Sequence, residues 1–469
     1  MKFSSSAVPG MLALASAVAL PSIAALLAYG IIETPDSPGY LAYAEQIRTG
    51  TIPTGIALLH SVAGRISLYR IGGFPALLAM LQTLFPGGWK LALVALQIAA
   101  QSGVAVACYA TARKLGAAYN FALAGALLPS IGFAAVMNIC VLTDALNAAA
   151  VSGAALALIL APNWRGALFA GLCLAFATSF REATIYLVLA YLPLALLTQR
   201  RLLCAALILL PAWGVAAGQI GWNVSRGAGP VLTTCKQLVM VQALLPLIHD
   251  HVPVYAIDPV FAAAAAQTID IGGYSRIDAF EDALYAQGYT SPQIAAEASH
   301  DYALAWRHYP LRMLGATLGD FRKNYLFMPF QPQETVATLE VYTTGQRPVS
   351  NRMNVLWSEL RGGSITALGW IILNVVCQIA GTLISMVGLI APWRLRGAWR
   401  LRALWCVPVC LVALYMPVHL EIRYLTPAVP IICVLAAVGA TRWMSALNPR
   451  RKPASHRSGA KYDPAAPPQ

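Results

Sequence analysis

Long apolar runs separated by short polar connections make up most of this chain. Apolar runs of this kind are typical of helices that cross a membrane. The pattern predicts about ten spans, at residues 7–32, 88–112, 118–137, 141–161, 165–180, 183–198, 202–221, 366–391, 403–417 and 424–441. We therefore expect an all-α fold, a polytopic transmembrane helical bundle with juxtamembrane helices on one side.

The polar segments divide the chain into four parts. The predicted parts are an N-terminal membrane block (1–221) with a first outer loop (33–72), a helical outer segment (222–365), a C-terminal membrane block (366–441) and a disordered tail (442–469). In the outer segment, Ser291-Pro292 predicts a helix start, with Ser291 as the N-cap. Residues 311–328 alternate apolar and charged residues, which is typical of a helix lying in the membrane interface. The apolar residues after Gly72 predict a re-entrant or interfacial segment.

Composition and charge support a membrane protein and orient it. Hydrophobic residues make up 58% of the chain and charged residues 11%, which excludes an ordinary soluble globular protein. With the N-terminus inside, half of the 32 basic residues fall on the inner side together with one acid, Asp463. This asymmetry is what the positive-inside rule requires. We expect a bacterial inner-membrane protein whose basic loops contact anionic lipids. These loops account for the net charge of +13, so we expect no nucleic-acid partner.

Asp36 is the most informative single residue. It lies in Glu33-Thr-Pro-Asp-Ser-Pro-Gly-Tyr40, where the first span ends. A carboxylate at this depth is costly and is usually functional. The alternative is a solvated acid in a tight turn, because Asp, Ser, Pro and Gly all favour turns.

Further polar residues fall on the same predicted outer side, at the ends of other spans. They are Arg70, Asp144, Arg181, Glu182, His419, Glu421 and Arg423. Each has an ordinary alternative: Arg70 as an anchor, Asp144 as a helix N-cap, Arg181-Glu182 as an interfacial pair, Arg423 as a snorkelling cation and His419 as a loop histidine. Their convergence on one face favours a site instead. Arginines and histidine can hold a phosphate, and a carboxylate can deprotonate or orient a hydroxyl nucleophile.

Four short motifs in this order resemble the GT-C superfamily of integral-membrane glycosyltransferases. Within it, the chain resembles bacterial relatives of protein O-mannosyltransferases and of the aminoarabinose transferases that modify lipid A. The motifs are Asp36-Ser-Pro-Gly-Tyr-Leu-Ala-Tyr-Ala, Phe74-Pro-Ala-Leu-Leu-Ala-Met-Leu, Arg181-Glu-Ala and Arg423-Tyr-Leu-Thr-Pro-Ala-Val-Pro430.

The resemblance implies a periplasmic active site that takes its sugar from a polyprenyl-phosphate donor and inverts the anomeric centre. It implies that Asp36 is the carboxylate that activates the acceptor or organises a metal, and that Asp144 is a second acid. A divalent metal is therefore a candidate cofactor, although no residue is assigned as a metal ligand. The expected substrate-binding residues are Tyr40, Arg70, Arg181, Glu182, His419, Glu421, Arg423 and Tyr424. The acceptor is a lipid, a glycan or a protein. The alternative functions are a transporter or flippase, or a polymerase-type membrane protein, for lipid-linked glycans.

Overall fold

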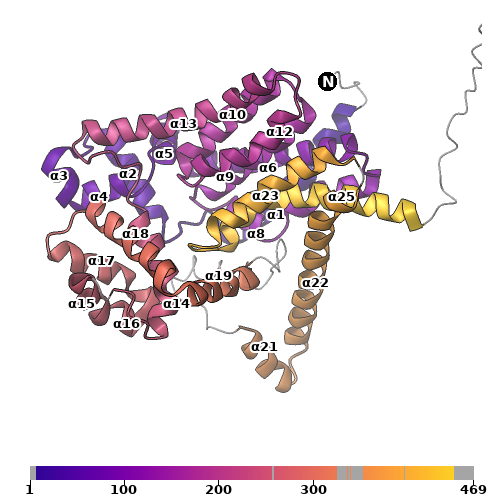
Figure 1. The fold of residues 1–469 in the computed structure, drawn as a ribbon. Coiled ribbons are helices and arrows are strands. Elements are labelled where there is room, and N and C mark those ends of the chain that lie inside the picture. Colours follow the sequence, from indigo (N-terminus) through magenta and orange to yellow (C-terminus); the bar gives the residue numbers. More distant parts are fainter. Residues whose placement is uncertain are drawn as a thin grey trace, which may run out of the picture.

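A computed structural model describes residues 7–255, 258–324, 335, 339, 352–395 and 397–447 of the chain. Within these residues the structure is helical and contains no strand (Figure 1); a single isolated bridge pairs Ile32 with Cys140. The predicted all-α fold is therefore confirmed.

Five described helical stretches are long and apolar enough to cross a membrane. They are α1 (Ala7–Tyr29), α6 (Trp89–Lys114), α13 (Arg201–Ser225), α22 (Ile365–Arg394) and the stretch Ile422–Leu447, which contains α24 (Ile422–Leu425) and α25 (Val429–Leu447). Shorter apolar helices accompany them, namely α5 (Gly73–Leu84), α9 (Asp144–Leu160) and α10 (Trp164–Phe180). The total of about ten spans stays a prediction.

The structure interrupts one of the predicted spans. Residues 118–137 form α7 (Tyr119–Leu127), a 3-10 turn that contains Pro129, and α8 (Phe133–Met137). Gly132, which lies between the turn and α8, has a positive φ of 72°, so this segment does not continue as one helix. Residues 183–198 contain one continuous helical stretch, Thr184–Leu196, made of α11 (Thr184–Leu187), a 3-10 turn and α12 (Leu192–Leu196).

Helix α25 belongs to the most buried of the long apolar stretches. In the most apolar window of Ile422–Leu447, 78% of the residues are buried, against 17% for α1 and 22% for α13. Helix α25 packs against α6, α7, α22 and α23 (Trp399–Tyr415) (Figure 1). Outward-facing leucines such as Leu27 and Leu202 are more than four-fifths exposed, as expected for helices whose outer faces contact lipid.

Small residues allow the central helices to approach closely. A Cβ added at Gly171 of α10 would lie 1.9 Å from the carbonyl oxygen of Leu207 in α13. Helix packing in membranes depends on such small residues, because they let two backbones come into contact.

The outer segment forms its own helical cluster. Its helices are α14 (Lys236–His249), α15 (Pro259–Gln267), α16 (Ile269–Gly272), α17 (Ile277–Ala286), α18 (Ser291–His308) and α19 (Pro310–Asn324). They share an apolar core that includes Phe261, Phe280 and Ile294. Figure 1 shows α14–α18 at the opposite end of the bundle from the N-terminus and the end of α25.

Three boundaries differ from the predictions. The N-cap of α18 is Thr290, not Ser291, because Thr290 and Gln293 form a capping box. The predicted interfacial helix corresponds to α19, and its residues after 324 lie outside the described part. The predicted tail begins too early, because α25 continues to Leu447; residues 448–469 lie outside the described part.

The first outer loop folds into short helices that are anchored to the bundle. These are α2 (Ser37–Thr49), α3 (Gly55–His60) and α4 (Val62–Tyr69), and α5 follows the loop. The segment predicted as re-entrant or interfacial is α5, which packs against α2 and α10 and buries Phe74. The remaining helix of the C-terminal half, α21 (Arg352–Arg361), precedes α22.

Candidate active site

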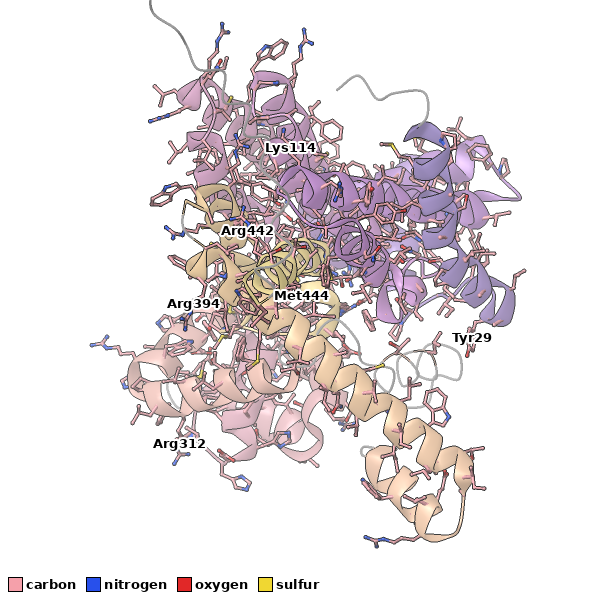
Figure 2. All side chains as sticks on the ribbon, turned by 90° about the vertical axis from the view of Figure 1, so that its right-hand side faces the viewer. Tyr29, Lys114, Arg312, Arg394, Arg442 and Met444 are labelled. Carbon is pink, nitrogen blue, oxygen red and sulfur yellow. The ribbon has the colours of Figure 1, made fainter. Side chains whose placement is uncertain are left out.

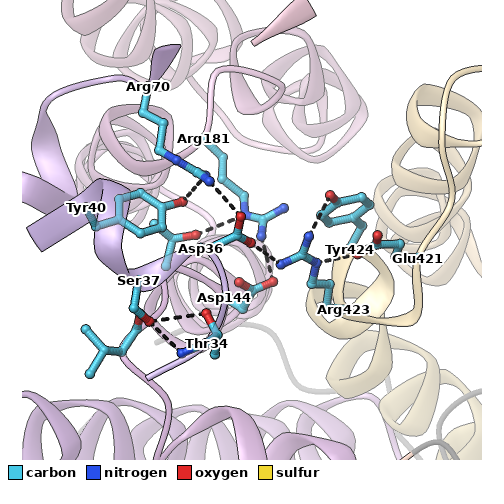
Figure 3. A network of polar contacts seen from close by, with 12 residues as sticks. Thr34, Asp36, Ser37, Tyr40, Arg70, Asp144, Arg181, Glu421, Arg423 and Tyr424 are labelled. Atoms are coloured by element: carbon cyan, nitrogen blue, oxygen red, sulfur yellow. Dashed lines mark hydrogen bonds and ion pairs between the residues drawn. The ribbon is translucent and has the colours of Figure 1, made fainter. Parts of the chain in front are cut away.

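The predicted site residues lie at the ends of different helices. Asp36 precedes α2 and Arg70 ends α4, while Asp144 begins α9 and Arg181 ends α10. Arg423 and Tyr424 belong to α24, which follows Glu421. Figure 3 shows these residues together in one polar network.

Backbone pairing fixes the loop that carries Asp36. The N–H of Ile32 donates to the carbonyl of Ile139, and the N–H of Val141 donates to the carbonyl of Ile32. The Ser37 hydroxyl donates to the carbonyl of Val141 at 2.9 Å and accepts from the N–H of Thr34 at 2.8 Å. These bonds hold the first loop against the segment that leads into α9, and so bring Asp36 towards Asp144.

Two arginines bind the two oxygens of Asp36. Arg70 donates from Nη2 to Oδ1 at 2.7 Å, and Arg423 donates from Nη1 to Oδ2 at 2.6 Å (Figure 3). The Asp36 side chain makes no capping bond to α2, although it stands at the N-cap position. The two arginines lie 34 and 387 residues away from Asp36 in the sequence. A role of Asp36 as a turn former, or of Arg70 as a membrane anchor, does not account for these contacts.

Arg423 is held from a second side by Glu421. Its Nε donates to Oε2 of Glu421, and Oε1 of the same carboxylate contacts Nε2 of His419 at 2.8 Å. Arg423 is therefore paired with two acids and does not merely snorkel to the interface. His419, Glu421, Arg423 and Asp36 form a continuous chain of contacts.

Asp144 and Arg181 form a second ion pair beside the first. Nη2 of Arg181 donates to Oδ1 of Asp144 at 2.6 Å, and Nε donates to the Thr143 hydroxyl at 3.3 Å. The Asp144 side chain is 1% exposed. The helix cap interpretation of Asp144 is wrong, because Thr143 holds the N-cap position. Arg181 bonds this distant acid rather than its neighbour Glu182.

Aromatic rings position the charged side chains. Arg70 donates from Nη1 to the Tyr40 hydroxyl at 2.6 Å, and its guanidinium lies 4.1 Å from the centre of the same ring. Tyr40 packs edge-on against Phe74 of α5. Both Arg181 and Arg423 lie about 5 Å from the ring of Tyr424, at 4.7 and 5.1 Å. Cations are attracted to aromatic faces, so Tyr424 helps to hold the two arginines near each other.

A cavity of about 240 Å³ opens beside these residues. The predicted residues that line it are Asp36, Tyr40, Arg70, Arg181, Glu182, His419, Arg423 and Tyr424. Asp144 and Glu421 do not line it; they contact arginines that do. The remaining wall is largely apolar, with Leu238 and Met240 from α14 and Leu414 and Val418 from the end of α23 and the loop after it.

A second cavity of about 510 Å³ reaches Asp36 from another side. It shares Asp36, Tyr69, Arg70 and Leu238 with the first cavity. Its other polar residues come from the outer segment and from α4, and they are Arg65, Gln237, Asp278, Glu281, Asp282 and Tyr285. Asp36 therefore stands at the junction of a cavity rich in arginine and a cavity rich in carboxylates.

The arginines keep the site carboxylates ionised. Burial alone would raise the pKa of Asp36, but the charges of Arg423 and Arg70 outweigh burial and hold the pKa below its usual range. Burial also opposes ionisation of Glu421, yet Arg423 and His419 lower its pKa to about 2. Both groups are carboxylates at neutral and mildly acidic pH.

The residues around Asp36 do not fit a divalent metal. Each oxygen of Asp36 faces a guanidinium group, and Glu33, the nearest acid in sequence, bonds Lys90 at 2.6 Å. Across the described part of the chain, no group of three or more His, Cys, Asp or Glu side chains is arranged to hold a metal ion.

The sequence did not indicate several residues of the first cavity. Tyr69, Tyr415, Cys235 and Gln242 also line it. The aromatic residues lie within apolar runs, where their spacing is that of ordinary core positions. Cys235 and Gln242 belong to the outer segment, whose position over the membrane block is not visible in local sequence patterns.

The fold was compared with known proteins. No protein-family profile matches the chain, and no curated protein matches it in sequence. The similar solved structures include two oligosaccharyltransferases. One is the archaeal oligosaccharyltransferase AglB from Archaeoglobus fulgidus, in complex with an inhibitory peptide and a dolichol-phosphate, with 11% identity and a TM-score of 0.49. The other is an oligosaccharyltransferase of the same organism in the apo form, with 12% identity and a TM-score of 0.46.

The matches cover most of this chain and about half of each archaeal chain. The shares are 96% of this chain and 52% of AglB, and 94% and 51% for the apo structure. With identities of 11–12% and TM-scores below 0.5, these likenesses assign neither a superfamily nor a function to this chain, so the functional argument rests on its own side chains.

Proposed function

We propose that this protein is a GT-C-type membrane glycosyltransferase that moves a sugar from a polyprenyl-phosphate donor to an acceptor. The observation that carries the proposal is Asp36, clamped between Arg70 and Arg423 where two cavities meet. A transferase that joins two substrates needs one reacting centre that both can reach. We place this centre at the periplasmic face of a bacterial inner membrane, as the charge distribution of the sequence predicts.

The first cavity suits the donor. Arg70, Arg181 and Arg423 line it, and their contacts within the protein use only part of the five N–H donors of each guanidinium. Guanidinium groups bind phosphate through charge-assisted and often paired hydrogen bonds. The apolar wall beside them suits the first isoprene units of a lipid chain.

The second cavity suits the acceptor. Its carboxylates Asp278 and Asp282 would repel a phosphate, so the two substrates are sorted by charge. Arg65 lies near Asp282 at 3.6 Å and over the ring of Tyr285, and Gln237 can donate and accept hydrogen bonds. An acceptor hydroxyl or amide reaching from this cavity would meet Asp36 opposite the donor.

The ion pairs suggest how donor binding raises the basicity of Asp36. While Arg70 and Arg423 bind the carboxylate, Asp36 is a weak base. A donor phosphate that draws hydrogen bonds from the same arginines would weaken this hold and raise the basicity of Asp36. Asp36 would then accept a hydrogen bond from the acceptor and take its proton as attack proceeds.

The proposed reaction is a single displacement. The acceptor oxygen or nitrogen forms a bond to the anomeric carbon, and the bond from that carbon to the phosphate oxygen breaks. The leaving polyprenyl phosphate keeps the bonding electrons, and the arginines stabilise its growing charge. Attack from the side opposite the phosphate inverts the anomeric centre. Asp144 is a positioning residue in this scheme, because it holds Arg181 and does not line the cavity.

The substitution Asp36→Asn tests the proposal. It removes the charge with almost no change in shape, and we expect transfer from polyprenyl-phosphate sugars to fall by roughly a hundred- to ten-thousand-fold. Initial rates would be measured with purified full-length protein in lipid vesicles, using a panel of such donors and a lipid extract as acceptor.

Asp258→Asn is the matched control. Asp258 also precedes a proline-containing helix, α15, but its side chain caps that helix by accepting the N–H groups of Val260 and Phe261. Asn caps as well as Asp, so this variant should retain activity. If Asp36→Asn folds normally and transfers sugar at the wild-type rate, the proposed role of Asp36 is wrong.

A further inference from the structure

A basic groove lies at the end of the bundle opposite the candidate active site. Lys114 ends α6, Arg400 lies in the first turn of α23, and Arg442 lies near the end of α25. All three line one cavity of about 480 Å³, together with Trp399. Figure 2 looks onto this end of the bundle, with Lys114 and Arg442 labelled. We call the cavity the basic groove.

Helix α6 shows how far the basic groove is from the site. Lys90 at its start bonds Glu33 of the first loop at 2.6 Å. Lys114 lies 24 residues further along, which corresponds to roughly 36 Å of helix. This length is close to the thickness of a bilayer, so the groove lies at the other membrane surface.

The groove is built for an anion rather than for ion pairs within the protein. The described residues that line it include three cations and no carboxylate. Lys114 is fixed by a hydrogen bond to the carbonyl of Leu160 at 2.8 Å, and Arg400 and Arg442 line the same cavity. Like charges brought together from three separate helices repel one another, and a bound anion would offset this repulsion.

Neighbouring tryptophans place the groove at lipid headgroup depth. Trp399 is 65% exposed, and Arg402 lies over the rings of both Trp399 and Trp393. Exposed tryptophans with arginines at helix ends are typical of the membrane interface. We propose that the basic groove binds the headgroup of an anionic phospholipid, with its phosphate among Lys114, Arg400 and Arg442.

Native mass spectrometry of the full-length protein tests this site. The protein would be incubated in detergent with equal amounts of phosphatidylglycerol and phosphatidylcholine, and the retained lipid adducts counted. We expect phosphatidylglycerol to be retained preferentially and not to be displaced by excess inorganic phosphate. A surface cation contributes roughly fivefold to the binding of anionic lipid, so Lys114→Gln/Arg400→Gln/Arg442→Gln should reduce the preference by at least about tenfold.

The control variant removes the same number of charges outside the groove. Arg165, Arg200 and Arg201 are exposed, lie at the starts of α10 and α13, and do not line the cavity. Arg165→Gln/Arg200→Gln/Arg201→Gln should keep the preference, and both variants should keep the melting temperature measured in phosphatidylcholine alone. The proposal is overturned if the groove variant keeps its preference, if both variants lose it equally, or if inorganic phosphate displaces the lipid. None of these results depends on glycosyl transfer.

Discussion

Asp36 binds Arg70 and Arg423, which lie 34 and 387 residues away in the sequence, and does not cap its own helix. Its two oxygens hold Arg70 and Arg423, and the second of these is also held by Glu421. The planar guanidinium of Arg423 can contact two carboxylates in fixed directions, which a lysine ammonium cannot do. The site therefore depends on the shape of the arginine as well as on its charge.

Arg423→Lys should weaken donor binding more than it weakens folding. We expect the KM for the polyprenyl-phosphate donor to rise by roughly ten- to a hundredfold, because a bidentate charge-assisted contact is lost. Steady-state rates at varied donor concentration would measure this effect. Arg48→Lys is the control, since Arg48 pairs with Glu45 on the surface and is 47% exposed. An unchanged donor KM in Arg423→Lys would contradict a phosphate role for this residue.

At the scale of helices, close packing between α10 and α13 brings Arg181 to the site. Gly171 allows this contact, because a side chain there would meet the backbone of Leu207. At the end of α10 that carries Arg181, a Cβ added at Gly73 of α5 would lie 2.4 Å from the hydroxyl oxygen of Ser179. Gly171 lies inside an apolar helix and Gly73 is the first residue of another, and sequence patterns do not distinguish either glycine from other small residues.

Gly171→Ala should destabilise the protein, whereas Gly153→Ala should not. The first change forces apart two backbones and should cost about 1–3 kcal/mol, as overpacking does. Gly153 of α9 has open space around its Cβ position, so alanine there should stabilise the helix by up to about 1 kcal/mol. Thermal unfolding in detergent would show midpoints shifted in opposite directions. A similar loss in both variants would mean that helix contact is not the cause.

Helix α17 contains a carboxylate that is costly to ionise. Burial and the charge of Asp278 raise the pKa of Glu281 to about 7, and its Oε1 atom has no hydrogen-bond partner in the described structure. Gln237 donates to the other oxygen, Oε2, at 3.1 Å. A raised pKa means that the folded state holds this proton more tightly than the unfolded state does.

The consequence is a stability that falls as the pH rises. The contribution of Glu281 is fully present below about pH 4.5 and is lost as the pH rises through about 7. Glu281→Gln mimics the protonated form, so its melting temperature should match the wild type at pH 5 and exceed it at pH 8. Glu297→Gln, at a partly exposed position of α18, should leave the pH dependence unchanged. Parallel curves for wild type and Glu281→Gln would exclude this role.

At the scale of the whole molecule, the two ends of the bundle differ in charge and in shape. The candidate site and the outer segment lie at one end, and the basic groove lies at the other. This polarity suits a transferase whose chemistry takes place at one membrane surface. A transporter would need polar residues along a path through the bundle, and the sequence places few within the predicted spans.

Cysteine labelling tests the predicted orientation. In a background without the nine native cysteines, Gln287→Cys in the outer segment should react with a membrane-impermeant thiol reagent in intact spheroplasts. Asn120→Cys, an exposed residue at the start of α7, should react only after the membrane is opened. The reverse pattern would place the site at the cytoplasmic face and contradict the periplasmic assignment.

The sequence by itself predicted the class of fold and the collection of polar residues on one side of the bundle. A bilayer requires long apolar helices, and basic residues mark the inner loops, so both features follow from local composition. The same rules indicated Asp36, Arg70, Asp144, Arg181 and Arg423 as candidates, because charged residues at span ends are costly and few.

Only the tertiary structure decided which of these residues meet. The pairing of Asp36 with Arg423 and of Asp144 with Arg181 depends on the order and rotation of helices in the bundle. Helices that are apolar on nearly every side carry little information about which face turns inward, so sequence periodicity cannot define these contacts. The position of α14 over the first cavity and the meeting of two cavities at Asp36 have the same origin, because each results from packing between segments distant in the chain.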